Sequence, residues 1–142
     1  MSCAFCRVVA EEPEAHVYAD PEVVGFLDIR PVFHGHLLFV PRQHLRTLAD
    51  ASPDLLAALF SAVQVGMAAL ERAVGAQGTF VAVNNVISQS VPHLHVHVVP
   101  RRRKDGLRGF FWPRHPYREG ELEAMRERLR EAVAAVRSRA QP

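Results

Sequence analysis

The sequence has little cysteine and no long hydrophobic run, and each shortage excludes a class of protein. Two cysteines are too few for the disulfide framework of a small secreted domain. No apolar run approaches the length of about 20 residues that a bilayer-spanning helix needs. The N-terminus becomes acidic too early for a signal peptide. We therefore expect a cytoplasmic protein without a membrane partner.

The sequence also lacks a large surplus of charge of one sign. Its net charge is +2 with the histidines neutral, which is too small for a protein that coats nucleic acid. We expect no specific nucleic-acid partner, whereas a local pocket for an anion is compatible with this charge. The 142 residues are 49% hydrophobic and 23% charged, which is typical of one globular domain with a core. We expect a single domain over residues 1–142, in which residues 101–142 form a variable loop and helix.

Short strands, long helices and scattered prolines are the main structural features of the pattern. We expect strands at residues 16–18, 23–27, 36–40, 79–84 and 94–99, a short helix at 3–10, and long helices after Ser52-Pro53 and at 119–137. The first long helix has an apolar stripe at Leu56, Phe60, Val63, Met67, Leu70 and Val74. The second has one at Leu122, Met125, Leu129, Val133 and Val136. Because the strands are joined by short links, the predicted class is α+β, a five-stranded antiparallel sheet with two main helices.

Three of the eight histidines lie within five residues, at His93, His95 and His97. Side chains alternate along a strand, so the three imidazoles are expected on one side and the intervening apolar residues in the core. Three polar imidazole rings on one face of a strand are energetically unfavourable unless they bind a ligand or take part in a reaction. Imidazole is both a metal ligand and a nucleophile near neutral pH, so the cluster indicates metal binding or phosphoryl chemistry. The alternative is a set of histidines satisfied by ordinary contacts.

The two cysteines stand in a C-x-x-C spacing at Cys3 and Cys6. In a reducing compartment this spacing is more often half of a metal site or a redox pair than a structural disulfide. Two free thiols are the remaining alternative, and the spacing alone does not decide among them.

The alternation of histidine and apolar residues at 93–99 resembles the signature of the histidine-triad superfamily. Gln89-Ser90-Val91 matches the residues that precede the signature in that family. Further blocks at residues 3–6, 17–20, 26–29, 35–36 and 40–44 also resemble the family pattern, in the expected order. The resemblance covers roughly residues 1–103.

The resemblance implies a nucleotidyl hydrolase or transferase that cleaves at the α-phosphate of a nucleoside phosphoramidate or a dinucleoside polyphosphate. His95 matches the family nucleophile, which forms a covalent nucleotidyl-histidine. His97 matches the histidine that contacts the phosphate and assists the leaving group, and His36 matches the fourth family histidine beside the nucleophile. A non-catalytic nucleotide-binding or adaptor module with the same fold is the alternative. A zinc or redox protein built around the two cysteines is a third interpretation.

The resemblance also implies the residues that bind a purine nucleotide or nucleotide conjugate. Asp28 matches the acid that binds the ribose hydroxyls, for which a carboxylate is a suitable acceptor. Asn84, Gln89 and Ser90 match the phosphate region. Phe5, Phe26 and Ile29 match the apolar slot for the base, although each aromatic taken alone fits core packing equally well.

Four residues match the zinc ligands of the bacterial family members that carry the metal, namely Cys3, Cys6, His44 and His93. A site with four protein ligands is closed, so the implied zinc is structural. The resemblance further implies a homodimer.

The sequence departs from the family pattern in three places. The loop between Asn85 and Gln89 is short and lacks the usual glycines, while Pro92 and His34 are unusual at their positions.

The basic run at residues 101–104 is either a solvated loop or a site that attracts a polyphosphate. The aromatic stretch at 109–114, within a predicted loop at 101–118, is either a dimer contact or a lid on a neighbouring site.

Overall fold

The computed structural model describes residues 3–108 and 113–140. Its internal contacts divide the chain into two units, Met1–Asp105 and Gly106–Pro142. Most of the predicted aromatic contact, residues 109–112, lies outside the described residues.

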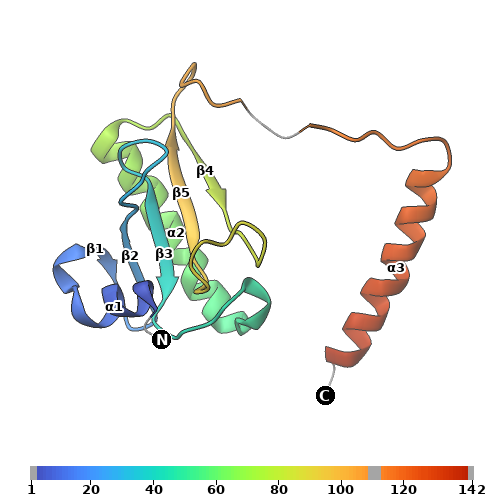
Figure 1. The fold of residues 1–142 in the computed structure, drawn as a ribbon, viewed down its shortest axis with the longest axis horizontal. Helices are drawn as coiled ribbons and strands as arrows, with labels where there is room; N and C mark the ends of the chain where they lie inside the picture. The colour runs from blue at the N-terminus through green and yellow to red at the C-terminus, as the bar shows by residue number, and fades with distance from the viewer. Residues whose placement is uncertain (1–2, 109–112, 141–142) are drawn as a thin grey trace. The chain divides into compact units, whose positions relative to one another are not determined.

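A five-stranded sheet forms the centre of the first unit (Figure 1). The strands follow the order β1-β2-β3-β5-β4, and every neighbouring pair is antiparallel. Their bounds are β1 (His16–Ala19), β2 (Val23–Leu27), β3 (Leu37–Pro41), β4 (Gly78–Ala82) and β5 (Val96–Arg101). The predicted α+β class with a five-stranded antiparallel sheet is confirmed.

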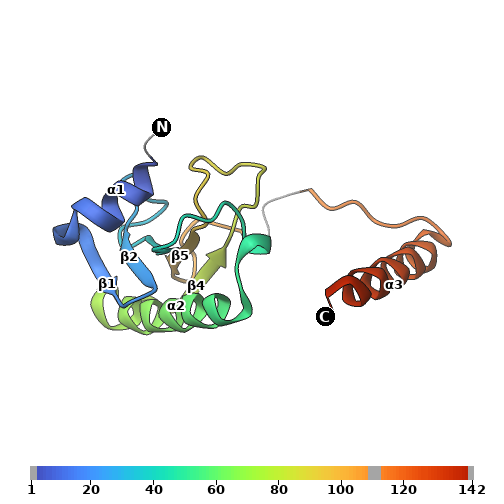
Figure 2. The same ribbon diagram turned by 90° about the horizontal axis from the view of Figure 1, so that it is seen from below.

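Two helices lie on opposite faces of this sheet, α1 (Ala4–Glu11) and α2 (Pro53–Val74) (Figure 2). The hydroxyl of Ser52 accepts the backbone N–H of Leu55 and so caps α2, as the Ser-Pro pair predicts. Gly75 ends the helix with a φ of 66°, a left-handed conformation that glycine adopts without steric cost. Two 3₁₀ turns, Pro13–Ala15 and Leu48–Asp50, were not predicted.

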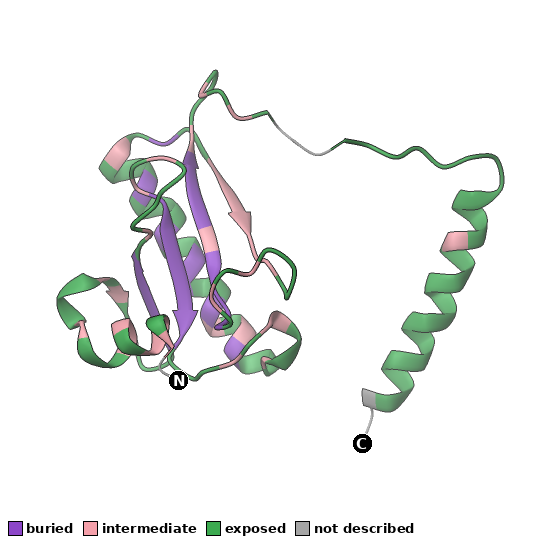
Figure 3. Ribbon diagram, viewed as in Figure 1, coloured by how far each residue is buried: buried purple, intermediate pink, exposed green. Residues whose placement is uncertain are grey.

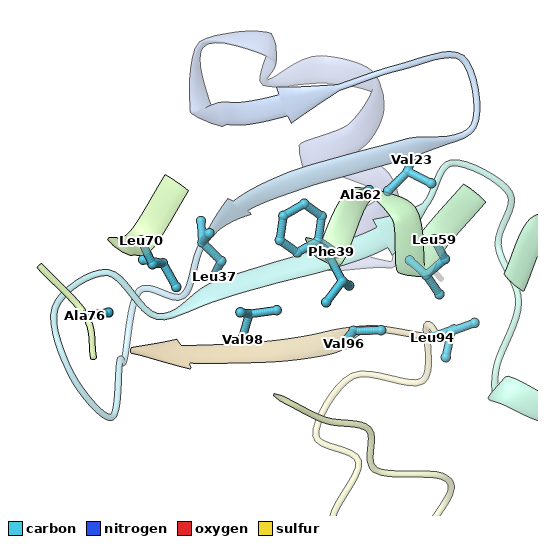
Figure 4. Packing of buried hydrophobic residues seen from close by; sticks show 11 residues of the cluster. Val23, Leu37, Phe39, Leu59, Ala62, Leu70, Ala76, Leu94, Val96 and Val98 are labelled. Carbon is cyan, nitrogen blue, oxygen red and sulfur yellow. The ribbon is translucent and has the colours of Figure 1, made fainter. Parts of the chain in front are cut away.

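The main core lies between α2 and the sheet (Figure 3). Phe39 is at its centre and is 1% exposed (Figure 4). A side chain at Gly66 of α2 would place its Cβ 2.5 Å from the Phe39 ring, so glycine lets the helix approach the sheet closely. On the opposite face, a smaller cluster joins four sheet residues to one side of α1, namely Val24, Phe26, Leu38 and Val40 with Phe5, Val8 and Val9.

The buried face of α2 differs from the predicted stripe. Val63 and Leu70 are buried as expected, but Phe60 and Met67 are more than one third exposed. The remaining buried positions are Leu55, Leu59, Ala62 and Gly66. Residues 55–70 contain no charged side chain, so periodicity alone did not locate the inward face.

Among the described helices, α2 alone is long and apolar enough to span a membrane by length and composition, with a mean hydropathy of 1.5 over 18 residues. The sequence prediction that no apolar run is long enough to span a bilayer did not take α2 into account. Its buried residues pack against the sheet, as those of a core helix do.

The strand that carries the histidines begins at Val96, two residues later than predicted, and continues through Pro100 to Arg101. His93 and His95 therefore precede the strand. The predicted alternation is nevertheless confirmed, because Leu94, Val96 and Val98 are fully buried in the core on the α2 side.

Within its described residues the second unit contains one helix, α3 (Glu121–Ala140), which confirms the helix predicted at 119–137. Acidic residues lie in its first turn and arginines in its last turn, an arrangement that favours the helix macrodipole.

Candidate functional site

A cavity of about 660 Å³ opens on the α1 side of the sheet. Seven of the residues predicted to act on a nucleotide line it: Phe5, Phe26, Asp28, Ile29, Ser90, His95 and His97. The pairing of the strands explains part of this set. Leu38 of β3 pairs with Phe26 on one side and with His97 on the other, so all three side chains face α1.

His95 is only 3% exposed, yet it lines the cavity. Its Nδ1 lies 2.7 Å from the backbone carbonyl of His93. A carbonyl can only accept a hydrogen bond, so Nδ1 carries the proton and Nε2 of the neutral ring keeps its lone pair. The ring of Phe5 meets the His95 ring edge-on, with centroids 5.0 Å apart. Helix α1 therefore supports the imidazole from the side of the cavity.

His97 is linked to His36, whose Nε2 lies 3.0 Å from Nδ1 of His97. Burial lowers the pKa of His36, and the charge of Asp28 partly opposes this. The pKa of His97 is lowered to about 4, chiefly by burial and then by His95 and His36, while Asp28 again opposes the shift. Both rings are therefore neutral at physiological pH.

Three of the residues predicted to act on a nucleotide do not line the cavity: His36, Asn84 and Gln89. His36 acts through His97 and not on the cavity itself. The amide of Gln89 donates to the carbonyl of Arg46 at 2.6 Å and accepts the N–H of Val86 at 3.1 Å, so this side chain holds the short loop. The basic run at 101–104 does not line the cavity either. Arg101 instead donates to the carboxylate of Asp105 at 2.6 Å.

Sequence reasoning missed the outer wall of the cavity. Val8, His16 and Arg30 line it, and Nε2–H of His16 donates to the carbonyl of Val8 at 2.8 Å. The signal for Val8 was present in the sequence, because it follows Phe5 by three residues and so shares its face of α1.

The four predicted metal ligands come together at one end of α1. The ligand atoms of Cys3, Cys6, His44 and His93 all lie within 4.8 Å of one another. The Sγ atoms of both cysteines are 3.5 Å from Nδ1 of His93, and Sγ of Cys6 is 3.2 Å from Nδ1 of His44. Tetrahedral zinc with ordinary bond lengths separates sulfur and nitrogen ligands by roughly 3.5 Å.

The protonation of His93 also suits a metal. Its Nε2 lies 2.9 Å from the carbonyl of Pro41 and must donate to it, so Nδ1 keeps a lone pair toward the cysteines. Two thiols and two imidazoles are a typical zinc donor set. The residues present therefore fit the metal.

A second group of ligand-type atoms, from Asp28, His36 and His97, does not fit a metal as well. The backbone N–H of Val32 donates to Nδ1 of His36 at 3.1 Å. The single proton of neutral His36 must then sit on Nε2, the atom that would have to bind the ion. We interpret this group as a hydrogen-bond chain.

Residues 9–104 match the family model described as HIT domain. The chain belongs to the histidine-triad (HIT) family. It is 35% identical to an uncharacterized HIT-like protein of Mycobacterium tuberculosis, across 96% of this chain and 99% of the relative. It is 32% identical to an adenylylsulfatase of Arabidopsis thaliana, across 95% and 68% of the two chains. It is 29% identical to an adenosine 5′-monophosphoramidase of Schizosaccharomyces pombe, across 91% and 96%.

Solved structures share the fold. A Streptococcus mutans protein superposes with a TM-score of 0.83 at 32% identity, across 93% of this chain and 85% of that one. A zinc-bound histidine-triad family protein of Mycobacterium smegmatis has a TM-score of 0.71 at 35% identity, across 95% and 98%.

Proposed function

We propose that the protein is a nucleotidyl hydrolase or transferase that attacks the α-phosphate of a nucleoside phosphoramidate, dinucleoside polyphosphate or related conjugate. The observation that carries this proposal is the tautomer of His95. Its Nδ1–H is held by the His93 carbonyl, which leaves Nε2 as a nucleophile in a ring that lines the cavity. Relatives named as an adenylylsulfatase and as an adenosine monophosphoramidase support the same reaction class.

The reaction begins when Nε2 of His95 attacks the α-phosphorus in line with the leaving group. The His93 carbonyl stabilises the cationic ring that forms in the nucleotidyl-histidine, because it accepts the remaining Nδ1–H. His97 donates a hydrogen bond to the phosphoryl or leaving oxygen. Water or another acceptor then displaces His95 from phosphorus.

The nucleotide binds along the cavity from base to phosphate. Phe5, Phe26 and Ile29 form the slot for a purine base. The Oδ1 atom of Asp28 accepts the N–H of Arg30 at 2.9 Å, so the other oxygen remains for the ribose hydroxyls. Ser90 lies at the phosphate end, beside His95 and His97.

Zinc is the proposed cofactor, held by Cys3, Cys6, His44 and His93. The donor set fits it, and a zinc-bound relative supports it. Four protein ligands leave no open position, so the metal supplies structural stability and takes no part in the reaction.

We also propose that the protein is a cytoplasmic homodimer without a nucleic-acid partner. The outward side of α2 supports the dimer, because residues 55–70 carry no charge although Phe60, Val65 and Met67 are all at least one third exposed.

The test of catalysis is release of the mononucleotide. Purified protein is given adenosine phosphoramidate, adenylyl sulfate and diadenosine tetraphosphate, and AMP is measured by chromatography. We expect AMP from at least one substrate, a nucleotidyl adduct on the intact protein at alkaline pH, and loss of both in His95→Ala. His34→Ala, which changes an exposed histidine outside the cavity, serves as the matched control. Purine nucleotide binding by calorimetry without any turnover would favour the non-catalytic module instead.

A further inference from the structure

The apolar stripe of α3 is open to solvent. Leu122, Leu129, Val133 and Val136 are each between 49% and 67% exposed, and Met125 is partly exposed. Figure 3 shows nearly the whole helix as exposed. These five side chains lie within about 80° of one another around the helix axis, so they form one continuous face. A continuous apolar face of this kind is typical of a helix that binds a partner.

The spacing of this stripe is the same in both directions along the chain. Its members follow one another at steps of three, four, four and three residues, with Leu129 in the middle. An antiparallel second copy of α3, related by a two-fold axis beside Leu129, therefore places Leu122 opposite the partner's Val136 and Met125 opposite the partner's Val133. Each apolar side chain then meets another apolar side chain.

The charges of α3 favour the antiparallel direction over a parallel one. Glu121 and Glu123 lie in the first turn, whereas Arg137 and Arg139 lie in the last turn. In an antiparallel pair, Glu123 lies near the partner's Arg137 at one edge of the stripe, and Glu121 lies near the partner's Arg139 at the other edge. A parallel pair would instead bring four glutamates together at one end and four arginines at the other.

Arginines border one side of the stripe near its middle. They line a shallow groove of about 580 Å³, formed by Arg126, Leu129, Arg130, Val133, Ala134 and Arg137. Arg126 pairs with Glu123, and Arg130 pairs with Glu127, on the same helix. These two charges are therefore offset locally, and the aliphatic parts of both arginines extend the apolar surface that a second helix can cover.

A lipid surface suits α3 less well than a second copy does. Residues 121–140 contain four glutamates, five arginines and no aromatic residue. Helices that lie on anionic membranes typically carry an excess of lysine and arginine, with large side chains such as tryptophan or phenylalanine on the apolar face. The nearly balanced charge of α3, with opposite signs at its two ends, instead matches a copy of itself.

We propose that α3 pairs antiparallel with α3 of a second copy, with Leu129 beside the two-fold axis. The inference rests on the proposed homodimer, because isolated helices of this length are marginally stable and associate weakly. A dimer that already holds two chains together raises the local concentration of one α3 near the other. The segment 106–120 joins α3 to the first unit, and about 15 residues can reach up to roughly 50 Å.

The first test is cross-linking of the full chain with a short bismaleimide. Leu129→Cys should give a dimer linked at position 129, and mass spectrometry separates this link from links at the native cysteines. Ala124→Cys, an exposed change on the other side of the helix, is the matched control. Leu129→Cys should give at least about tenfold more dimer than this control, because pairing raises the local thiol concentration. Co-expressed Leu122→Cys and Val136→Cys chains should link to each other, whereas each variant alone should not form a linked dimer.

The second test reverses charges in chains that carry Leu129→Cys. Arg137→Glu combined with Arg139→Glu makes both ends of the helix acidic and should abolish the link at position 129. Glu121→Arg combined with Glu123→Arg makes both ends basic and should have the same effect. Co-expression of the two charge variants should restore the link, because each acidic end then meets a basic end.

Several results would overturn the inference. An equal yield from Ala124→Cys, or a link between two Leu122→Cys chains, would exclude the antiparallel pair. Binding of the wild-type protein to phosphatidylglycerol vesicles, if Leu129→Glu abolishes it, would assign the stripe to a membrane. A wild-type mass of one chain in sedimentation equilibrium would overturn the homodimer and this inference together. A wild-type dimer without the link at position 129 in Leu129→Cys would overturn only the pairing of α3.

Discussion

At the scale of single residues, the alternation of side chains along the sequence predicted which residues lie together. It did not predict which nitrogen of each histidine ring carries the proton. The alternation of histidine and apolar residues at 93–99 correctly placed Leu94, Val96 and Val98 in the core. Which nitrogen of His95 or His97 carries the proton depends on a carbonyl two residues away and on a backbone N–H 65 residues away. The partners of His97 are set by tertiary structure, so the sequence contains no local signal for them.

The short loop after Asn85 is a second case in which residue-level chemistry decides. The sequence lacks glycine there, and the structure places Val86 and Ser88 in the left-handed region with φ of 71° and 61°. This conformation is unfavourable for a β-branched residue and typically costs about 1–3 kcal/mol. The Gln89 amide accepts the N–H of Val86 and donates to the carbonyl of Arg46, and these two hydrogen bonds hold the loop against that cost.

Val86→Gly should therefore stabilise the protein. Val86 is 54% exposed, so little buried surface is lost, and glycine removes the strain at a cost of about 0.5–1 kcal/mol in chain entropy. We expect a net gain of roughly 0.5–1 kcal/mol in the free energy of unfolding, measured with urea. Ile87→Gly is the matched control, because Ile87 is 79% exposed and has no positive φ. Equal destabilisation by both changes would show that the loop is not strained.

At the scale of helices and strands, the existence and the order of these elements could be predicted from the sequence, whereas the inward face of α2 could not. The Ser-Pro cap and Gly75 gave the ends of α2 correctly. Its inward face was assigned wrongly in part, because apolar residues surround the helix and the strongest stripe included the exposed Phe60 and Met67. Strand β5 begins later than predicted because the N–H of Leu94 donates to the carbonyl of Leu45 at 2.7 Å, outside the sheet.

Helix α1 is the element that the proposed zinc would stabilise. It has only eight residues, too few for a stable isolated helix, and none of them is fully buried. Cys3 and Cys6 connect it to His44 and His93, while Phe5 between them packs against His95 and Phe26. The proposed zinc thus holds one wall of the nucleotide slot.

Cys3→Ser should consequently loosen this wall. We expect zinc content, measured by mass spectrometry, to fall below half an equivalent and the melting temperature to decrease. KM for the nucleotide should rise about tenfold, because an aromatic contact such as that of Phe5 is worth about 0.5–1.5 kcal/mol. The value of kcat should change less, since the His93 carbonyl still holds His95. Ala10→Ser, an exposed change in the same helix, is the control, and full zinc content in Cys3→Ser would contradict the ligand assignment.

At the scale of the whole molecule, the outward side of α2 is a feature that a monomer leaves unexplained. Its middle presents Ala57, Gln64 and Ala68, all exposed, and the stretch 55–70 has no charge to keep it in water. Small residues let two helices approach closely, so we propose a second copy of α2 as the partner of this surface. We therefore propose this surface as the interface of the expected homodimer.

Ala68→Arg should convert the proposed dimer into a monomer. The arginine adds charge and bulk at the centre of the uncharged surface, and burying it unpaired against a second helix is strongly unfavourable. Sedimentation equilibrium should give twice the chain mass of 15.9 kDa for the wild type and a single chain mass for the variant. Ala73→Arg lies on the same helix outside the uncharged stretch and should remain dimeric. A wild-type mass of one chain would exclude the dimer, whereas a dimeric Ala68→Arg would move its interface away from α2.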